Sequence, residues 1–430
     1  MGTLTTKEAR HLLARVGLGV RLEEVNRYYG GSRGASVRHA VYSSAKWDLP
    51  PPRITPWRPW SKQTIQQRNH AQQRLMLDKQ AVKHWQIKML LRTPYPLTER
   101  MVIFWHNWFT TSIDRVNQPE LLIQQNRLFR HHALGNFKQF LHALIRDPAM
   151  LIYLDNNTNN KDQTNENFAR ELLELFTVGE GNFRESDMHA AKLALTGWSV
   201  DRRTGRFVFH KHLHDNSVKF FMGKKGNFNG DDIINILLQN PRTAQNIAER
   251  IARKFWAEFV SDEKPNLATI RRWGIVFRHA KYDIRTLLIT VLNSPEFWSP
   301  RNRGEKAKSP IELVVGTLRS LHLKSAMTPP QIIDVCTTLG QPLFNPETPE
   351  GYRSGRAWIT PYTLPIRVNL MSTLVANTNS HDLAYIPVLS KKQAINWLLA
   401  RKPTKALPTQ PIDIKTLIHE LVTDRAYQLT

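Results

Sequence analysis

The chain contains a single cysteine, Cys336, among its 430 residues. One cysteine excludes an internal disulfide framework and metal sites built from CxxC pairs, but it does not identify the compartment. The sequence also lacks an apolar run of roughly 18 residues, the length that a membrane-spanning helix needs. Its first residues show no apolar segment followed by a small-residue cleavage site. We therefore expect a soluble chain with no membrane span and no signal peptide.

Acidic residues are scarce. The chain has 36 Asp and Glu against 60 Lys and Arg, which gives a formal net charge of +24. Such an excess indicates an anionic partner, and nucleic acid, acidic polysaccharide and an anionic membrane surface all qualify. A basic surface that is merely solvated is the alternative. The hydrophobic share of 41% is ordinary for a folded protein and excludes disorder over most of the length.

Apolar residues recur at intervals of three and four through most of the chain, as in 97–109, 119–134 and 243–260. This periodicity predicts a mainly α, multi-helical globular protein. Alternating apolar residues around a Thr-Gly turn predict one small β-hairpin, from about Trp198 to His212. Proline-rich and basic clusters suggest an N-terminal helical cap (1–60), a central helical body with the hairpin and the candidate site (61–300), and a C-terminal helical region (301–430) packed on the same core.

The segment "NENFARELLELF" places Glu166, Arg170 and Glu174 on one face of a helix. One interpretation is a row of salt bridges on the solvent side. The other is a functional site, which the neighbouring Asn165, Asn167 and Glu171 favour. In that site Glu166, Glu171 and Glu174 are metal ligands or acid/base groups, and Arg170 clamps a carboxylate, sulfate or phosphate.

Histidines supply a second set of candidates. His106 lies in "FWHNWF", a helix that is apolar on nearly every side, so we expect a buried imidazole that is either a core residue or a catalytic or ligand group. His210, His212 and His214 alternate along the predicted second hairpin strand, next to Asp215, and would share one face. Three such imidazoles suit a divalent transition metal, and the alternative is an exposed polar strand end. The predicted metal ligands are Glu174, His106 and His214.

The predicted helix at 61–92 carries seven Lys and Arg and a single acid, Asp78. It follows Trp57 and Trp60, whose flat rings could stack on bases or sugars. Cations beside aromatic rings suit single-stranded nucleic acid and acidic glycan alike, so Trp57, Trp60, Arg68 and Arg74 are predicted binding residues. The glycine-rich stretch 222–232 could hold an anion through backbone amides, and helix capping explains its aspartates.

Several motifs occur together and in order: "RMVIFWHNWFTTS", "NENFARELLELFTVGEGNF", "LALTGW", "HDNSVKFFMGKKGNFNGDD" and "LGQPLFNPETPEGYRSGRAWI". In this combination the chain resembles the bacterial family called domain of unknown function 1800, from about Ala9 to the C-terminus. The resemblance implies export to the periplasm or cell envelope. It also implies an anionic envelope polymer and a sulfatase-like or phosphatase-like protein as partners, by association only.

The resemblance draws attention to a set of polar positions, namely His106, Asn107, Asn165, Glu166, Asn167, Arg170, Glu171, Glu174, Trp198, His214, Asp215 and Lys219. The chain departs from the family pattern at Trp108, where a second histidine is expected, and in lacking an export signal. The first departure counts against a metal site that needs that imidazole, and the second leaves the localisation undecided.

Together these features predict an enzyme, hydrolase-like or metal-dependent, that acts on an anionic polymer such as an acidic or sulfated polysaccharide. His106 and His214 would transfer protons or bind a divalent metal. Substrate contacts are expected from Asn107, Asn167, Trp198 and Lys219. The alternative is a non-enzymatic protein that binds a polyanion, either nucleic acid or envelope glycan. The two differ in whether the carboxylates and histidines converge in one pocket.

Overall fold

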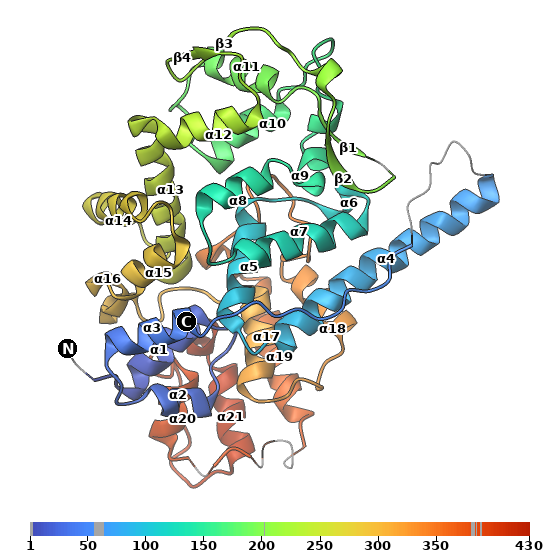
Figure 1. Cartoon of the computed structure of the whole chain (residues 1–430). Helices are drawn as coiled ribbons and strands as arrows, with labels where there is room; N and C mark the ends of the chain where they lie inside the picture. The colour runs from blue at the N-terminus through green and yellow to red at the C-terminus, as the bar shows by residue number, and fades with distance from the viewer. Residues whose placement is uncertain (1–2, 56–63, 202, 380–382, 384, 388) are drawn as a thin grey trace.

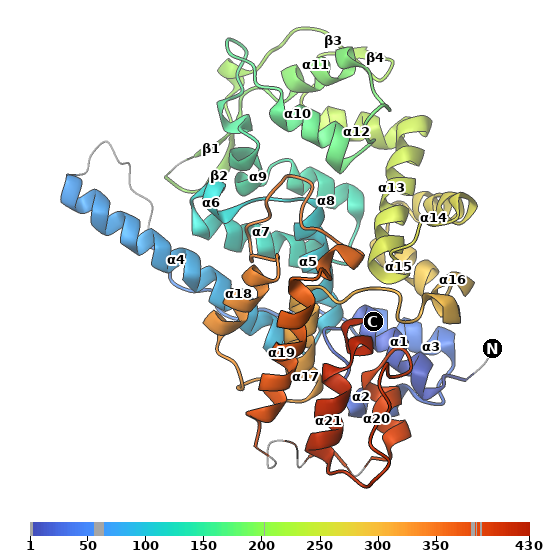
Figure 2. The same cartoon turned by 180° about the vertical axis from the view of Figure 1, so that it is seen from behind.

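A computed structural model describes residues 3–55, 64–201, 203–379, 383, 385–387 and 389–430. The protein is mainly α, as the apolar periodicity predicted, and the described residues add two small antiparallel β-hairpins (Figures 1 and 2). Buried side chains from Leu4 to Tyr427 belong to one hydrophobic cluster. The segments 1–60, 61–300 and 301–430 all contribute to this cluster.

The first three helices are α1 (Thr6–Val16), α2 (Leu22–Tyr28) and α3 (Arg33–Tyr42). The next helix, α4 (Ile65–Arg92), is the longest described. Its second half packs into the core through Val82, Trp85 and Ile87, whereas residues 64–77 are exposed or only half-buried. The first half of α4 therefore projects from the body of the molecule (Figures 1 and 2).

The central body contains the helices α5 (Pro96–Trp108), α6 (Ile113–Val116), α7 (Pro119–His132), α8 (Phe137–Leu144), α9 (Pro148–Tyr153), α10 (Asn167–Glu171), α11 (Glu185–Ala194), α12 (Gly230–Gln239), α13 (Pro241–Phe259), α14 (Leu267–His279), α15 (Ile284–Leu292) and α16 (Pro295–Trp298). Proline occupies the first turn of five of these, where its missing N–H and fixed φ cost nothing. One departure from α geometry bears on the site. Directly after α10 the chain forms one π-helical turn, Leu172–Phe176.

The predicted hairpin is confirmed as β1 (Trp198–Asp201) and β2 (Arg206–Phe209), in a register that pairs Trp198 with Phe209. A second hairpin, β3 (Lys219–Phe221) and β4 (Lys224–Gly226), replaces the glycine-rich loop expected there. Its two-residue turn has positive φ at Met222 (47°) and Gly223 (80°). Turn residues with positive φ match the right-handed twist of paired strands. Gly223 adopts such a φ without strain and therefore closes the hairpin.

The C-terminal region comprises α17 (Pro310–Ser320), α18 (Pro329–Thr338), α19 (Thr363–Ala376), α20 (Lys391–Leu398) and α21 (Ile414–Thr423). Arg319 of α17 ties this region to the N-terminal half. Its guanidinium donates to the backbone carbonyls of Leu18, Leu90, Leu91 and Thr93 at 3.0–3.1 Å. Within the described ranges, no helix is both long and apolar enough to cross a membrane.

Candidate functional site

Arg170 is the centre of a row of ion pairs on the surface of α10. Its guanidinium lies 2.9 Å from Glu166, 3.3 Å from Glu174 and 3.0 Å from Glu185 of α11. The hydrogen bond from Arg170 lowers the pKa of Glu166, and the carboxylates together raise the pKa of Arg170. About half of the Glu166 side chain (46%) is exposed. An arginine engaged by three carboxylates holds two helices together and has little capacity left to clamp a substrate anion.

Glu171 and Glu174 belong to a more enclosed group around the π-helical turn. Burial and the carboxylates of Glu174 and Glu350 raise the pKa of Glu171. Burial and Arg250 lower the pKa of Lys254 on α13, while Glu350 opposes that change. Glu350 thus acts on a carboxyl and an amine whose pKa values shift toward each other. A raised carboxyl pKa and a lowered amine pKa are the directions in which burial and neighbouring charges tune catalytic acids and bases.

The π-helical turn is held from two sides. The carbonyl of Leu175 accepts hydrogen bonds from Trp108 Nε1 at 2.9 Å and from Arg250 Nη2 at 3.0 Å. The ammonium group of Lys254 lies 5.7 Å from the centre of the Trp108 ring. A π-turn inserts a residue and leaves a backbone carbonyl for other donors, and such turns are frequent at functional sites. Trp108, the position that departs from the family pattern, therefore anchors this turn.

Asn107 positions the loop that carries Glu350. Its Oδ1 accepts a hydrogen bond from the backbone N–H of Tyr352 at 2.6 Å. Gly351 has a φ of +96°, and a Cβ there would overlap the backbone carbonyl of Asn107. Asn107 therefore holds residues 351 and 352 in place, and this contact positions the preceding residue, Glu350.

His106 is buried in the interior. Its ring packs edge-on against Phe129 and Phe344, with centroid distances of 6.2 and 5.2 Å. Burial lowers the pKa of His106 to about 4, so the imidazole is neutral at physiological pH. Its Nε2 atom has no hydrogen-bond partner within the part of the chain that the structure describes. The prediction that His106 is buried is confirmed, and its neighbours are aromatic rings.

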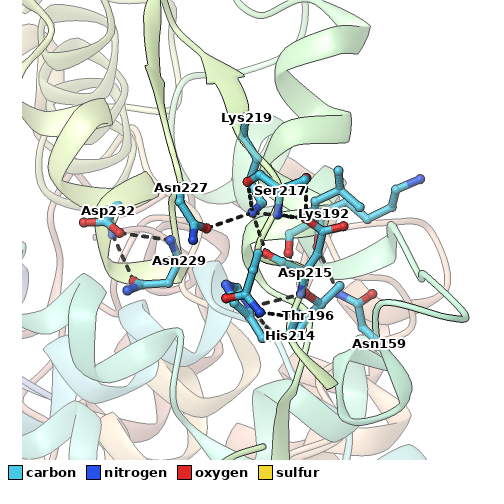
Figure 3. Close-up of polar contacts among 12 residues, drawn as sticks. Asn159, Lys192, Thr196, His214, Asp215, Ser217, Lys219, Asn227, Asn229 and Asp232 are labelled. Atoms are coloured by element: carbon cyan, nitrogen blue, oxygen red, sulfur yellow. Dashed lines mark hydrogen bonds and ion pairs between the residues drawn. The ribbon is translucent and has the colours of Figure 1, made fainter. Parts of the chain in front are cut away.

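The histidine-rich segment after β2 differs from the prediction. The strand ends at Phe209, and Lys211–Leu213 form a 3-10 helix, so His210, His212 and His214 do not alternate along one strand face. His214 is buried, and its Nδ1 lies 2.9 Å from the carbonyl of Thr196 (Figure 3). Its role is to fasten this segment to the turn before β1.

Asp215 and Lys219 complete the same network (Figure 3). The Asp215 N–H donates to Thr196 Oγ1 at 2.8 Å, and Lys219 Nζ donates to the carbonyls of Asp215 (2.6 Å) and Ser217 (3.0 Å). Burial raises the pKa of Asp215, but hydrogen bonds from Ser217 and Lys219 outweigh that effect and the pKa is lowered overall. The Lys219 side chain is only 1% exposed. These contacts give the "HDNSVK" segment a structural role.

Trp198 and Asn167, two further predicted substrate-binding residues, contact other side chains of the protein. Trp198 is buried, with the guanidinium of Arg146 5.0 Å above its ring. Asn167, half-buried, begins α10, and its N–H donates to Asn165 Oδ1 at 2.9 Å.

Metal ligation was predicted at Glu174, His106 and His214. Over the described ranges, no three or more His, Cys, Asp or Glu side chains form a group that could hold a metal ion. These three side chains are separated because His106 packs among aromatic rings and His214 binds Thr196, whereas Glu174 pairs with Arg170. The predicted ligand set is therefore not assembled.

The predicted binding residues fall partly on α4. Arg68 and Arg74 lie on its projecting half and are exposed. Trp57 and Trp60 lie outside the described residues. Lys83 is half-buried, and burial lowers its pKa. The cations of α4 therefore differ in exposure, which the sequence could not indicate.

Lys254 and Glu350 are not among the residues that the sequence predicted for the site. Glu350 directly precedes Gly351 and Tyr352 in the motif "LGQPLFNPETPEGYRSGRAWI", so the motif indicates its segment but not its role. Lys254 lies in the amphipathic α13, where nothing in the spacing distinguishes it from a solvated lysine.

Comparison with protein families agrees with the motifs. A model of the family described as "Protein of unknown function (DUF1800)" matches residues 11–427, nearly the whole chain. The chain belongs to this family. Neither a curated protein nor a solved structure matches this DUF1800 protein. The membership leaves the activity open.

Proposed function

We propose that this DUF1800 protein binds an anionic polymer, such as an acidic glycan of the cell envelope, through cations on α4. The observation that carries the proposal is the exposure of three cationic side chains on α4. Arg74, Lys88 and Arg92 are exposed and form no ion pair with any described residue. The one acid of the helix, Asp78, already accepts a hydrogen bond from the Thr55 N–H at 3.0 Å.

Charge reversal on α4 tests the proposal. The variant carries Arg74→Glu, Lys88→Glu and Arg92→Glu, and leaves the half-buried Lys83 and the paired Lys79 unchanged. Binding to heparin and to a single-stranded oligonucleotide is measured by fluorescence anisotropy over a range of salt concentrations. We expect the wild-type log K to fall with log salt as counterions are released from the polymer, and the variant to bind more weakly with a shallower slope.

A matched control separates a binding surface from net charge. Lys264, Arg271 and Arg301 are exposed, and a triple reversal to Glu there changes the formal charge by the same amount. Arg271 lies on α14, on the opposite side of the molecule from the projecting end of α4 (Figures 1 and 2). Equal losses in both variants, or no binding of any polyanion at low salt, would contradict the proposal.

A second candidate function is acid/base catalysis on such a polymer by Glu171 and Lys254. It is supported by burial beside the π-helical turn, which raises the pKa of Glu171 and lowers the pKa of Lys254. In this role Glu171, whose pKa is raised, donates a proton to a leaving group, and Lys254, whose pKa is lowered, accepts one. Glu171→Gln should abolish depolymerisation of a bound glycan, detected by size-exclusion chromatography, and leave the affinity unchanged. Depolymerisation at the wild-type rate by this variant would exclude the role.

A further inference from the structure

A cationic hollow lies where α8, the end of α12 and the end of α14 meet, distinct from α4 and from the π-helical turn. Its volume is about 540 Å³. Five basic side chains line it, and no Asp or Glu is among its described lining residues: Lys138, His142, Arg278, His279 and Lys281. A concave site with one sign of charge concentrates counterions and focuses the field on a bound anion.

The floor of this pocket is a fixed piece of backbone. The Phe137 N–H donates to the carbonyl of Tyr282, and the Ile284 N–H donates to the carbonyl of Gly135, both at 2.9 Å. Asn136 Nδ2 donates to the carbonyl of Lys281 at 2.6 Å. Lys281 and Tyr282 have φ values of 53° and 64°, a conformation that needs such support in residues other than glycine. The start of α8 and the α14–α15 connection are thereby held in register.

Neighbouring side chains orient the cations. The guanidinium of Arg278 donates to Gln245 Oε1 at 2.8 Å, which leaves its other N–H groups for further acceptors. His142 lies between Asp231 Oδ1 at 2.9 Å and Asn235 Oδ1 at 3.3 Å. Asp231 also pairs with Arg146, so this nearby carboxylate contacts both His142 and Arg146. Neither Lys138 nor Lys281 forms an ion pair with a described residue.

The dimensions and the lining indicate the ligand. The pocket is larger than a single inorganic ion and lies in the range of small-molecule sites, roughly 300–1,000 Å³. Tyr282 and Leu238 add apolar surface beside the cations, and the Tyr282 hydroxyl is occupied by the Leu238 carbonyl at 2.9 Å. We propose that this pocket binds a tetrahedral oxyanion, either as free phosphate or sulfate or as a monoester on a sugar-sized molecule. This site goes beyond the polymer surface of α4 and does not depend on it.

Calorimetric titration of the full chain tests the proposal with inorganic phosphate, inorganic sulfate, glucose 6-phosphate, glucose 6-sulfate and glucose. We expect the anionic probes to bind and glucose not to bind. Tighter binding of the esters than of the inorganic ions identifies the ester as the source, and equal affinities identify the free ion. Saturable binding should also shift the imidazole proton signals of His142 and His279 in the wild-type protein.

Variants localise the binding. Lys138→Gln combined with Lys281→Asn removes two charges, and asparagine tolerates the left-handed backbone at 281. We expect this pair to weaken anion binding by at least about tenfold, because both removed groups donate charge-assisted hydrogen bonds to the anion. Lys264→Gln with Arg271→Gln removes equal charge elsewhere and should bind as the wild type does. Lack of binding of every anionic probe, unchanged His142 and His279 signals, or equal losses in both pairs would overturn the proposal. None of these results involves α4.

Discussion

At the scale of single residues, burial decides which groups titrate unusually. Asp147 is the N-cap of α9, and its Oδ1 accepts from the Met150 N–H at 2.9 Å and from Gln125 Nε2 at 2.7 Å. Despite these bonds, burial raises the pKa of Asp147 to about 7. A carboxyl whose folded pKa lies above its unfolded value stabilises the fold in its protonated form. That contribution is complete below the ordinary pKa of 3.8 and is lost as pH rises toward 7.

Asp147→Asn should therefore change how stability depends on pH. The amide resembles the protonated acid and keeps the Oδ1 acceptor, so we expect the variant to be more stable than the wild type at pH 7, on the order of a few kcal/mol. The difference should shrink as pH falls toward 4. Urea unfolding of both proteins between pH 4 and 8 measures it, with the exposed Asp334→Asn as control. A constant difference across that range would show that Asp147 is ionised throughout.

The candidate catalytic residue Glu171 also has a raised pKa. Burial first, and then the Glu174 and Glu350 carboxylates, raise its pKa, so its ionised form costs stability at neutral pH. Glu171→Gln should consequently stabilise the protein at pH 7 and lose this advantage at acid pH. Glu166 is the contrast, because Arg170 lowers its pKa and Glu166→Gln should not stabilise at pH 7. Thermal unfolding of both variants at pH 4.5 and 7 measures the two effects. A destabilised Glu171→Gln at pH 7 would mean that the carboxylate is paired.

At the scale of elements, the sequence predicts what local spacing determines. The i, i+4 spacing of Glu166, Arg170 and Glu174 correctly placed them on one face, and the Thr-Gly turn correctly located the first hairpin. The π-helical turn was not predictable, since it depends on Trp108 and Arg250 from other helices capturing one carbonyl. The strand assigned to His210–His214 was wrong because tertiary contacts of His214 with Thr196 curl the chain into a 3-10 turn.

Gly351 gives a prediction at this scale. It lies where the loop of residues 340–354 crosses α5, with φ at +96° and its α-carbon against Asn107. Gly351→Ala adds both backbone strain and a clash with the Asn107 carbonyl. We expect destabilisation on the order of 1–3 kcal/mol, measured by thermal unfolding. Gly223→Ala is the matched control, because its φ is also positive but no atom lies near the added Cβ. An equal cost at both positions would mean that the contact with Asn107 contributes nothing.

At the scale of the whole molecule, the basic side chains behind the net charge of +24 lie partly on the surface and partly in the interior. Arg10, Arg15 and Arg367 are buried, and Arg100 is held at 2.7 Å from both Glu258 and Glu312. Lys308 is half-buried, with its Nζ 3.4 Å from the centre of the Tyr427 ring. These cations are committed to the fold and do not reach a polymer outside. The count of basic residues therefore overstates the charge available for binding, which only the structure could establish.

The remaining surface charge should still oppose folding through repulsion among like charges. Because dissolved salt shortens the range of this repulsion to about 10 Å at 0.1 M, we expect the melting temperature to rise as NaCl increases from low millimolar concentrations to 0.3 M. Reversing Lys264, Arg271 and Arg301 to Glu lowers the formal net charge from +24 to +18, and this variant should show a smaller rise. Differential scanning calorimetry of both proteins across that salt series provides the measurement. A melting temperature that falls with NaCl in the wild type would mean that attractive ion pairs, such as the row around Arg170, outweigh the repulsion.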